Sequence, residues 1–127
     1  KEEPTVNSSE IAYRLMRHHL ADLQHEEFWV MLLSQSGKVL REVKIGQGGL
    51  TGTVADVKLI IRAAVDHLAS AMILFHNHPS GNLRPSPQDD ALTKKISEAA
   101  KLIDTRVNDH IIVSANGYYS YNDEGRM

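Results

Sequence analysis

A strand, a loop and a helix near the middle of this 127-residue chain constrain its fold more than any other stretch. Residues 71–75 are all apolar and precede a turn rich in proline and glycine, so they are typical of a short buried strand. His-Asn-His-Pro-Ser-Gly follows at 76–81, and a helix is expected from about Pro87. Because His76 and His78 are two residues apart, an extended chain places both side chains on one face where the strand ends.

The two imidazoles and a nearby carboxylate predict a metal site. Asp89 follows His78 by eleven positions, in what would be the first turn of the next helix. Imidazole and carboxylate ligands suit zinc, and three protein ligands leave a fourth position for water, as in catalytic sites. We therefore expect His76, His78 and Asp89 to bind one zinc ion per chain.

Both parts of this site have a purely structural alternative. Two histidines with one residue between them are often only polar side chains at a strand end. Ser86 and Asp89, with proline at the first helical position, also match a capping box, in which the pair bonds the backbone N–H groups at a helix start. The metal site is favoured because these residues share one Pro/Gly-rich loop between a buried strand and a helix, where functional sites concentrate.

Hydrolysis at a single zinc also needs a base that takes a proton from the metal-bound water. Glu26 and Glu27 stand immediately before the first apolar run and are the candidates. Strand alternation sends them to opposite faces, so at most one faces the metal, and periodicity does not decide which. A solvated acidic pair is the alternative. Glu42 is a third candidate with less support, because it lies within the second expected strand.

The rest of the sequence predicts a single α/β domain over residues 1–127. Asn7 and Glu10 indicate the start of a helix within residues 1–26, and Thr53 with Asp56 indicates a second. Further strands are expected at 28–33, 39–45, 107–113 and 118–121, the last two joined by a turn at Asn116-Gly117. The order αββαβαββ implies a mixed sheet flanked by helices.

Composition narrows the functional classes. The net charge of −2 gives no global electrostatic case for nucleic-acid binding. The absence of cysteine excludes disulfides and thiolate metal sites and agrees with the cytoplasmic location that we expect. No apolar run approaches the roughly 20 residues of a membrane span. The glycine-rich stretch 46–52 lacks the lysine of a P-loop and is expected to be a flexible flap over a groove.

The other histidines are not expected to be ligands. His18, His19 and His25 lie on or just after the first helix, where solvated polar positions are the simpler interpretation. His110 falls within an expected strand and is interpreted as a packed or hydrogen-bonded residue of the sheet.

The central motif resembles that of the JAMM (MPN+) metalloproteases, in which a glutamate is followed by His-x-His-Pro, six residues and Ser-x-x-Asp. Its counterparts here are Glu27, His76, His78, Pro79, Ser86 and Asp89. Within that superfamily the motif at 76–81, together with 109–113 and 118–120, is similar to the RadC group. The resemblance runs from about Phe28 to the C-terminus and implies a cytidine-deaminase-like JAMM fold. RadC proteins usually carry an upstream helix-hairpin-helix region, which this chain, starting at Lys1, is expected to lack.

The resemblance also implies a role for each residue. His76, His78 and Asp89 would bind zinc, with a water completing the tetrahedron. Glu27 would be the general base, because Glu-Phe-x-x-x-Leu leads into the first strand as in related domains. Ser86 would hydrogen-bond the oxyanion of the tetrahedral intermediate. The reaction would be attack of water on a peptide or isopeptide carbonyl, with a protein substrate that the sequence does not specify.

Two other functions stay open. A zinc hydroxide can attack a phosphodiester, so a nuclease acting in DNA repair, the historical label of RadC, is one alternative. Phosphoryl chemistry commonly recruits further cations, and Arg84 is the only basic residue in the motif loop. A non-catalytic zinc-bound scaffold is the other alternative. A zinc deaminase is excluded because its Pro-Cys-x-x-Cys ligands are absent. The sequence does not define the oligomeric state.

Overall fold

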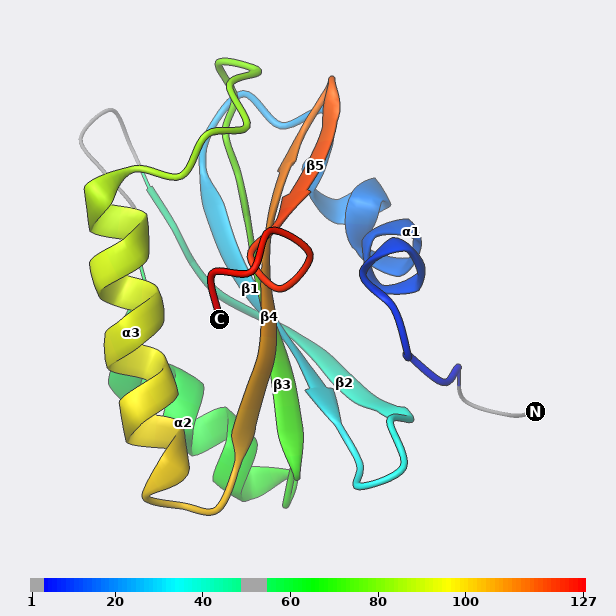
Figure 1. Cartoon of the computed structure of the whole chain (residues 1–127), viewed down its shortest axis with the longest axis vertical. Coiled ribbons are helices and arrows are strands. Elements are labelled where there is room, and N and C mark those ends of the chain that lie inside the picture. The colour runs from blue at the N-terminus through cyan, green and yellow to red at the C-terminus, as the bar shows by residue number, and fades with distance from the viewer. Residues whose placement is uncertain (1–3, 49–54) are drawn as a thin grey trace.

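The computed structural model describes residues 4–48 and 55–127 and contains one mixed sheet with helices on both sides (Figure 1). The elements are, in chain order, α1 (Ser9–Leu20), β1 (Glu27–Leu33), β2 (Val39–Gln47), α2 (Val57–Asp66), β3 (Ala71–Asn77), α3 (Pro87–Lys101), β4 (Arg106–Ser114) and β5 (Gly117–Ser120). This order confirms the predicted α/β class and the succession αββαβαββ. None of the helices in the described ranges is long and apolar enough to cross a bilayer.

The five strands lie in the order β2-β1-β3-β4-β5. Among the strands of the described ranges only β3 and β4 run parallel, and α3 connects them, so the centre of the sheet is a β–α–β crossover. The other neighbouring pairs are antiparallel. The parallel pair matters for function because it places the ends of β3 and β4 side by side at the edge where the motif loop leaves the sheet.

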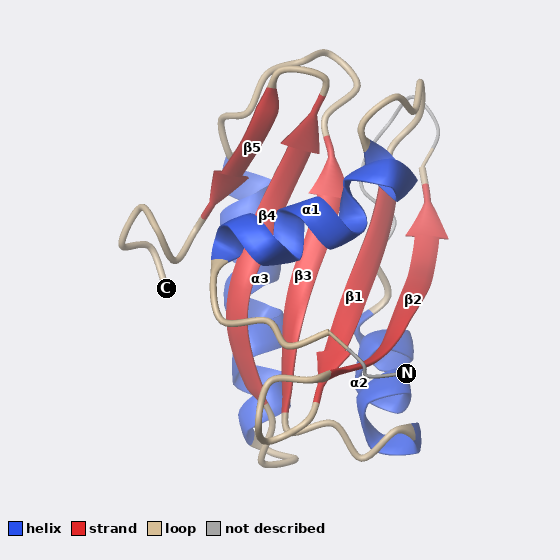
Figure 2. Cartoon of the chain, turned by 90° about the vertical axis from the view of Figure 1, so that its right-hand side faces the viewer, coloured by secondary structure: helices blue, strands red, loops and turns tan. Residues whose placement is uncertain are grey.

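Helices cover the two faces of the sheet unequally (Figure 2). α1 crosses one face, and α2 and α3 lie behind the other. Each face has its own apolar cluster, because successive side chains of a strand point to opposite sides. On the α2/α3 face the fully buried strand residues of the cluster are Phe28, Val30, Leu32, Met72 and Leu74. On the α1 face the buried strand residues are Met31, Leu33, Val39, Ala71, Ile73, Phe75, Ile111 and Val113.

Several predicted boundaries were wrong by a residue or two. The cap of α1 is Ser8, not Asn7, because the Ser8 hydroxyl accepts the N–H of Ile11. The α2 cap is Asp56, whose carboxylate accepts the N–H of Lys58; Thr53 and most of the predicted flap lie outside the described residues. The last hairpin turns at residues 115–116, since Gly117 already pairs with Ser114.

β3 is two residues longer than predicted and ends at Asn77. His76 therefore lies within the strand, paired with Phe28 of β1 and Ile112 of β4. The N–H of His78 also bonds the carbonyl of Val113, at 2.9 Å, so the parallel ladder continues past the end of the strand. Both histidines are thus fixed by regular backbone hydrogen bonds.

Candidate metal centre

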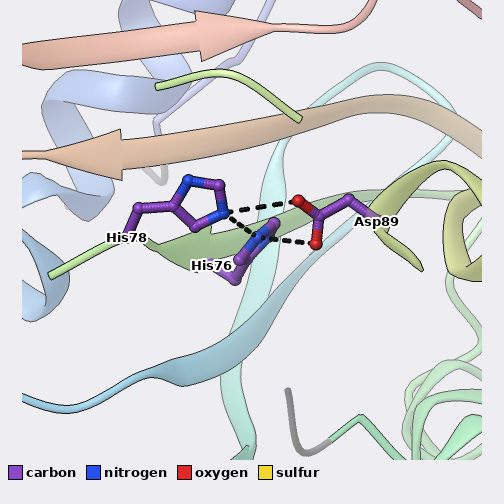
Figure 3. A group of neighbouring side chains, drawn as sticks. All are labelled: His76, His78 and Asp89. Atoms are coloured by element: carbon purple, nitrogen blue, oxygen red, sulfur yellow. Dashed lines mark hydrogen bonds and ion pairs between the residues drawn. The ribbon is translucent and has the colours of Figure 1, made fainter. Parts of the chain in front are cut away.

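His76, His78 and Asp89 converge at the end of β3 (Figure 3). The Nε2 atoms of the two histidines are 3.0 Å apart. One carboxylate oxygen of Asp89 lies 3.2 Å from His76 Nε2, and the other lies 3.3 Å from His78 Nε2. His76 and Asp89 are buried and His78 is half-buried. The predicted trio is therefore brought together as a group of donors that could hold a metal ion.

Asp89 carries a negative charge in this group at neutral pH. Burial alone would raise the pKa of its carboxyl, but the adjacent imidazole rings of His76 and His78 and the hydrogen bond from the N–H of Ser86 lower that pKa well below its usual range. Burial would lower the pKa of His78, and the bonds to Asp89 and to the carbonyl of Asn82 raise it instead. A charged carboxylate between two imidazoles is a donor set that suits zinc.

Both rings have their second nitrogen occupied. His78 Nδ1 lies 2.7 Å from the carbonyl oxygen of Asn82, which can only accept, so Nδ1 carries the hydrogen. His76 Nδ1 lies 2.8 Å from Nε2 of His110 in the neighbouring strand. Partners on the far side of ligating rings are typical of metal sites, where they fix the orientation of the ring.

Ser86 and Asp89 form the capping box that was considered as the alternative to a metal site, and both descriptions hold together. The Ser86 hydroxyl accepts the N–H of Asp89 at 3.0 Å, and the Asp89 carboxylate accepts the N–H of Ser86 at 2.8 Å. The same carboxylate faces both histidines. The helix cap therefore orients the Asp89 side chain towards them rather than competing with that arrangement.

A tight turn returns the chain from β3 towards α3. The N–H of Gly81 bonds the carbonyl of His78, and Gly81 has φ +88°, a conformation that favours glycine. A Cβ on Gly81 would lie 2.9 Å from Nδ2 of Asn116, which itself bonds the Gly81 carbonyl. The turn thus needs glycine for its backbone conformation, and a Cβ there would also push the Asn116 amide away from the Gly81 carbonyl.

The two adjacent glutamates occupy different sides of the sheet. Glu26 lines a surface hollow together with His78, Ser86 and Asp89, and its charge contributes to the raised pKa of His78. Glu27 instead bonds the indole of Trp29, on the α1 face. Since His76 stacks against Phe28 on the opposite face, strand alternation directs Glu27 away from the donor group.

Glu27 is tied into a cluster of its own. Its carboxylate accepts from Trp29 Nε1 at 2.9 Å and lies 2.7 Å from His25 Nε2 and 3.2 Å from Lys44 Nζ. Burial would raise the pKa of Glu27, but these three partners lower it. Glu42 also faces α1, where it pairs with His19 at 3.1 Å. The structure therefore does not bring Glu27 or Glu42 to the donor group, contrary to the expectation for Glu27.

Asn77, between the two histidines, holds the backbone on both sides of Glu26. Its side-chain oxygen accepts the N–H of Glu27 at 2.7 Å, and its side-chain NH₂ donates to the carbonyl of His25 at 2.8 Å. Gly48 N–H bonds the carbonyl of Glu26 itself. Asn77 is 1% exposed, so these bonds are shielded from water. They fix residue 26 at the mouth of the hollow.

Sequence reasoning missed the contributions of Asn77 and His110. The interpretation of His110 as a hydrogen-bonded residue of the sheet is correct. Its bond to His76 has no signal in the sequence, because 34 positions separate the two histidines. Of the histidines expected to be solvated, His18 is exposed, whereas His19 is half-buried and stacks on Trp29 with ring centres 4.1 Å apart.

Comparison with known proteins places the sequence of this chain in a family. The sequence model of the RadC-like JAB domain matches residues 6–126. This chain belongs to that family. The JAB domain is also 50% identical over 124 residues to a "UPF0758 protein" of Porphyromonas gingivalis, an alignment that covers 97% of this chain and 55% of the relative.

Two further relatives carry the same name. A "UPF0758 protein" of Flavobacterium johnsoniae is 42% identical over 120 residues, covering 94% of this chain and 52% of the relative. A "UPF0758 protein" of Streptococcus sanguinis is 35% identical over 127 residues, covering 100% of this chain and 56% of the relative. The JAB domain thus spans about half the length of the curated relatives it matches, and their names state no activity.

Proposed function

We propose that this JAB domain is a zinc-dependent hydrolase that cleaves a peptide or isopeptide bond. The observation that carries the proposal is the convergence of His76, His78 and Asp89 beside a hollow that also holds Glu26 and Ser86. Two imidazoles and a carboxylate are a ligand set of catalytic zinc, and a site with three protein ligands keeps one position open.

The donor group fits a divalent ion on its own chemistry. His78 directs its Nδ1–H to Asn82, so its Nε2 is the nitrogen that would bind the ion. Asp89 is ionised and buried, and the backbone N–H of Ser86 holds one of its oxygens. A bound zinc would act as a Lewis acid and lower the pKa of a water in the open position towards about 7.

Glu26 is the residue that we assign as general base, in place of Glu27. It lines the same hollow as His78 and Asp89, whereas the Glu27 carboxylate is engaged by Trp29, His25 and Lys44 on the α1 face. In this role Glu26 takes the proton of the attacking water and passes it to the leaving amine.

Ser86 is the residue that we assign to the developing oxyanion. Its hydroxyl oxygen accepts the N–H of Asp89, which leaves the single hydroxyl hydrogen able to donate. The α3 cap fixes the position of this hydroxyl at the rim of the hollow. A donor that is already in place stabilises the charge that appears as water adds to a carbonyl.

A carbonyl substrate suits the charges of the hollow better than a phosphodiester. Glu26 and Asp89 bring negative charge, and of the described residues that line the hollow only Arg84 carries a permanent positive charge. Phosphoryl transfer commonly uses several cations or a second metal to neutralise the phosphate. A peptide or isopeptide carbonyl is neutral and needs no such neutralisation.

The test compares zinc-loaded protein and two glutamate variants on pooled quenched-fluorescence peptides, isopeptide-linked peptides and duplex DNA. We expect Glu26→Gln to retain zinc and to lose about 100-fold or more of the peptide hydrolysis, the range for a lost general base. Glu27→Gln is the matched control and should keep the activity. If hydrolysis survived in Glu26→Gln and disappeared in Glu27→Gln, Glu27 would be the general base. If the protein cleaved only DNA, the substrate would be a phosphodiester and not a peptide or isopeptide.

A further inference from the structure

A buried chain of hydrogen bonds lies behind His76 and returns to Asp89. His76 Nδ1 is 2.8 Å from His110 Nε2, and His110 Nδ1 is 2.5 Å from the hydroxyl of Thr93. That hydroxyl donates to the backbone carbonyl of Asp89 at 2.7 Å. All four residues are at most 5% exposed. The chain therefore connects two members of the donor group through β4 and α3, out of reach of water.

The direction of each bond follows from the carbonyl at one end. The carbonyl of Asp89 can only accept, so the single hydroxyl hydrogen of Thr93 is used there. The Thr93 oxygen must then accept from His110, whose hydrogen lies on Nδ1. No other arrangement makes both Thr93 bonds.

His110 has one hydrogen to place. Its ring is fully buried, stacks on Tyr121 with centres 4.8 Å apart and meets the Phe28 ring edge-on. A fully buried imidazole that bonds no carboxylate is costly to charge, so the ring is neutral. With Nδ1 protonated, Nε2 is an acceptor, and His76 must donate from its own Nδ1.

We propose that Thr93 and His110 are positioning residues that set the tautomer of His76 and keep its Nε2 lone pair facing the metal. The inference rests on the proposed function only in treating His76 as a ligand. For His78 the carbonyl of Asn82 sets the tautomer directly, because it bonds Nδ1. His76 lies inside the sheet, where its nearest partner is another imidazole, so the directing carbonyl acts through His110 and Thr93.

The informative substitution is Thr93→Val, because valine keeps the shape of the side chain and removes the hydroxyl. Nδ1–H of His110 would then be buried without its acceptor, which favours moving the hydrogen to Nε2. His110 would donate to His76 Nδ1, and the hydrogen of His76 would have to lie on Nε2, the nitrogen that faces Asp89. Zinc would have to displace that hydrogen. Thr93→Ser retains the hydroxyl and is the matched control.

The first readout is zinc affinity, measured by competition with a chelating dye. We expect Thr93→Val to bind zinc about 10- to 100-fold more weakly than wild type, the range for lost partners of metal ligands, and Thr93→Ser to stay within a few-fold. Equal affinities for the valine and serine variants would overturn the proposal.

The second readout needs neither a variant nor a metal. Two-bond ¹H–¹⁵N correlation spectra of the metal-free wild-type chain at neutral pH report which nitrogen of His110 carries hydrogen. We expect Nδ1, and a hydrogen on Nε2 would overturn the proposal. Absence of zinc binding in the wild type would count against the proposed function alone, since the tautomer of His110 is read without zinc.

Discussion

Glu26 and Glu27 are neighbours in the sequence but meet different chemistry on the two faces of the sheet. Alternation predicted that only one of them could face the metal, and it did not predict which one. The deciding fact is the register of β1 against β3, in which Phe28 pairs with His76 and so puts Glu27 on the other side. The pairing of Phe28 with His76, 48 positions apart, has no local signal in the sequence.

The contacts of Glu27 make it a structural residue with a definite pH dependence. The pKa of Glu27 is lowered on folding, so its ionised form stabilises the folded state above the ordinary pKa of a glutamate. We expect Glu27→Gln to reduce the free energy of unfolding by about 1 kcal/mol at pH 7, since hydrogen bonds to a charged group are lost. The difference from wild type should vanish as pH falls through the lowered pKa.

Urea titrations of wild type and Glu27→Gln between pH 7 and pH 3 measure this difference. Arg14 and Glu10 form an exposed ion pair on α1, so Glu10→Gln is the control and should change stability little at any pH. If Glu27→Gln were as stable as wild type at neutral pH, the structural role of Glu27 would be contradicted. A loss of stability that grows towards pH 3 would contradict it as well.

At the scale of single elements, the first turn of α3 serves both the fold and the site. The Ser-x-x-Asp pattern correctly predicted both the cap and the convergence of Asp89 with the histidines. The two roles are compatible because a capping carboxylate has further lone pairs for other partners.

Removing the Ser86 hydroxyl tests its contribution to the α3 cap and its contribution to hydrolysis. We expect Ser86→Ala to cost about 1 kcal/mol of stability through the lost cap and, in addition, about 100-fold in hydrolysis through the lost oxyanion donor. Ser8→Ala removes the corresponding cap of α1, far from the hollow, and should match the stability loss without affecting hydrolysis. Thermal unfolding and peptide assays on both variants test this. Equal activities in the two variants would limit Ser86 to capping.

The side chain of Asn77 links β3 to the backbone at the start of β1. Its substitution should affect hydrolysis more than zinc binding. Asn77→Ser is too short to reach both the N–H of Glu27 and the carbonyl of His25, so residue 26 would no longer be held at the hollow. We expect hydrolysis to fall about 10-fold or more while zinc affinity changes less, because misplacing a reacting group costs rate. Isothermal titration with zinc and the peptide assay measure the two effects. A fall in affinity as large as the fall in rate would contradict this role.

At the scale of the whole molecule, the sequence predicted the succession of elements and left their arrangement open. The helix and strand patterns are local, and they correctly predicted the α/β class. The strand order β2-β1-β3-β4-β5 depends on long-range pairing, and the parallel contact of β3 with β4 is what brings His110 behind His76. The supporting residues of the site were therefore the part that sequence reasoning missed.

A metal that binds only the folded chain should stabilise the whole domain. We expect excess zinc to raise the melting temperature of the wild type and a chelator to reverse the rise, since ligand binding adds about 2.7 kcal/mol at 100 times Kd. Asp89→Asn removes the charged ligand and should melt at the same temperature with and without zinc. A rise in this variant equal to that of the wild type would place the metal elsewhere.

The most direct test of the central claim is the metal content of the purified chain, measured by elemental mass spectrometry after exposure to zinc and removal of the excess. The account predicts roughly one zinc per chain in the wild type and none in His76→Ala or Asp89→Asn. Asp90→Asn, which alters the neighbouring carboxylate bonded to Tyr121, should retain the metal. A wild-type chain without zinc, or an Asp89→Asn chain that keeps it, would contradict the claim that His76, His78 and Asp89 form a metal centre.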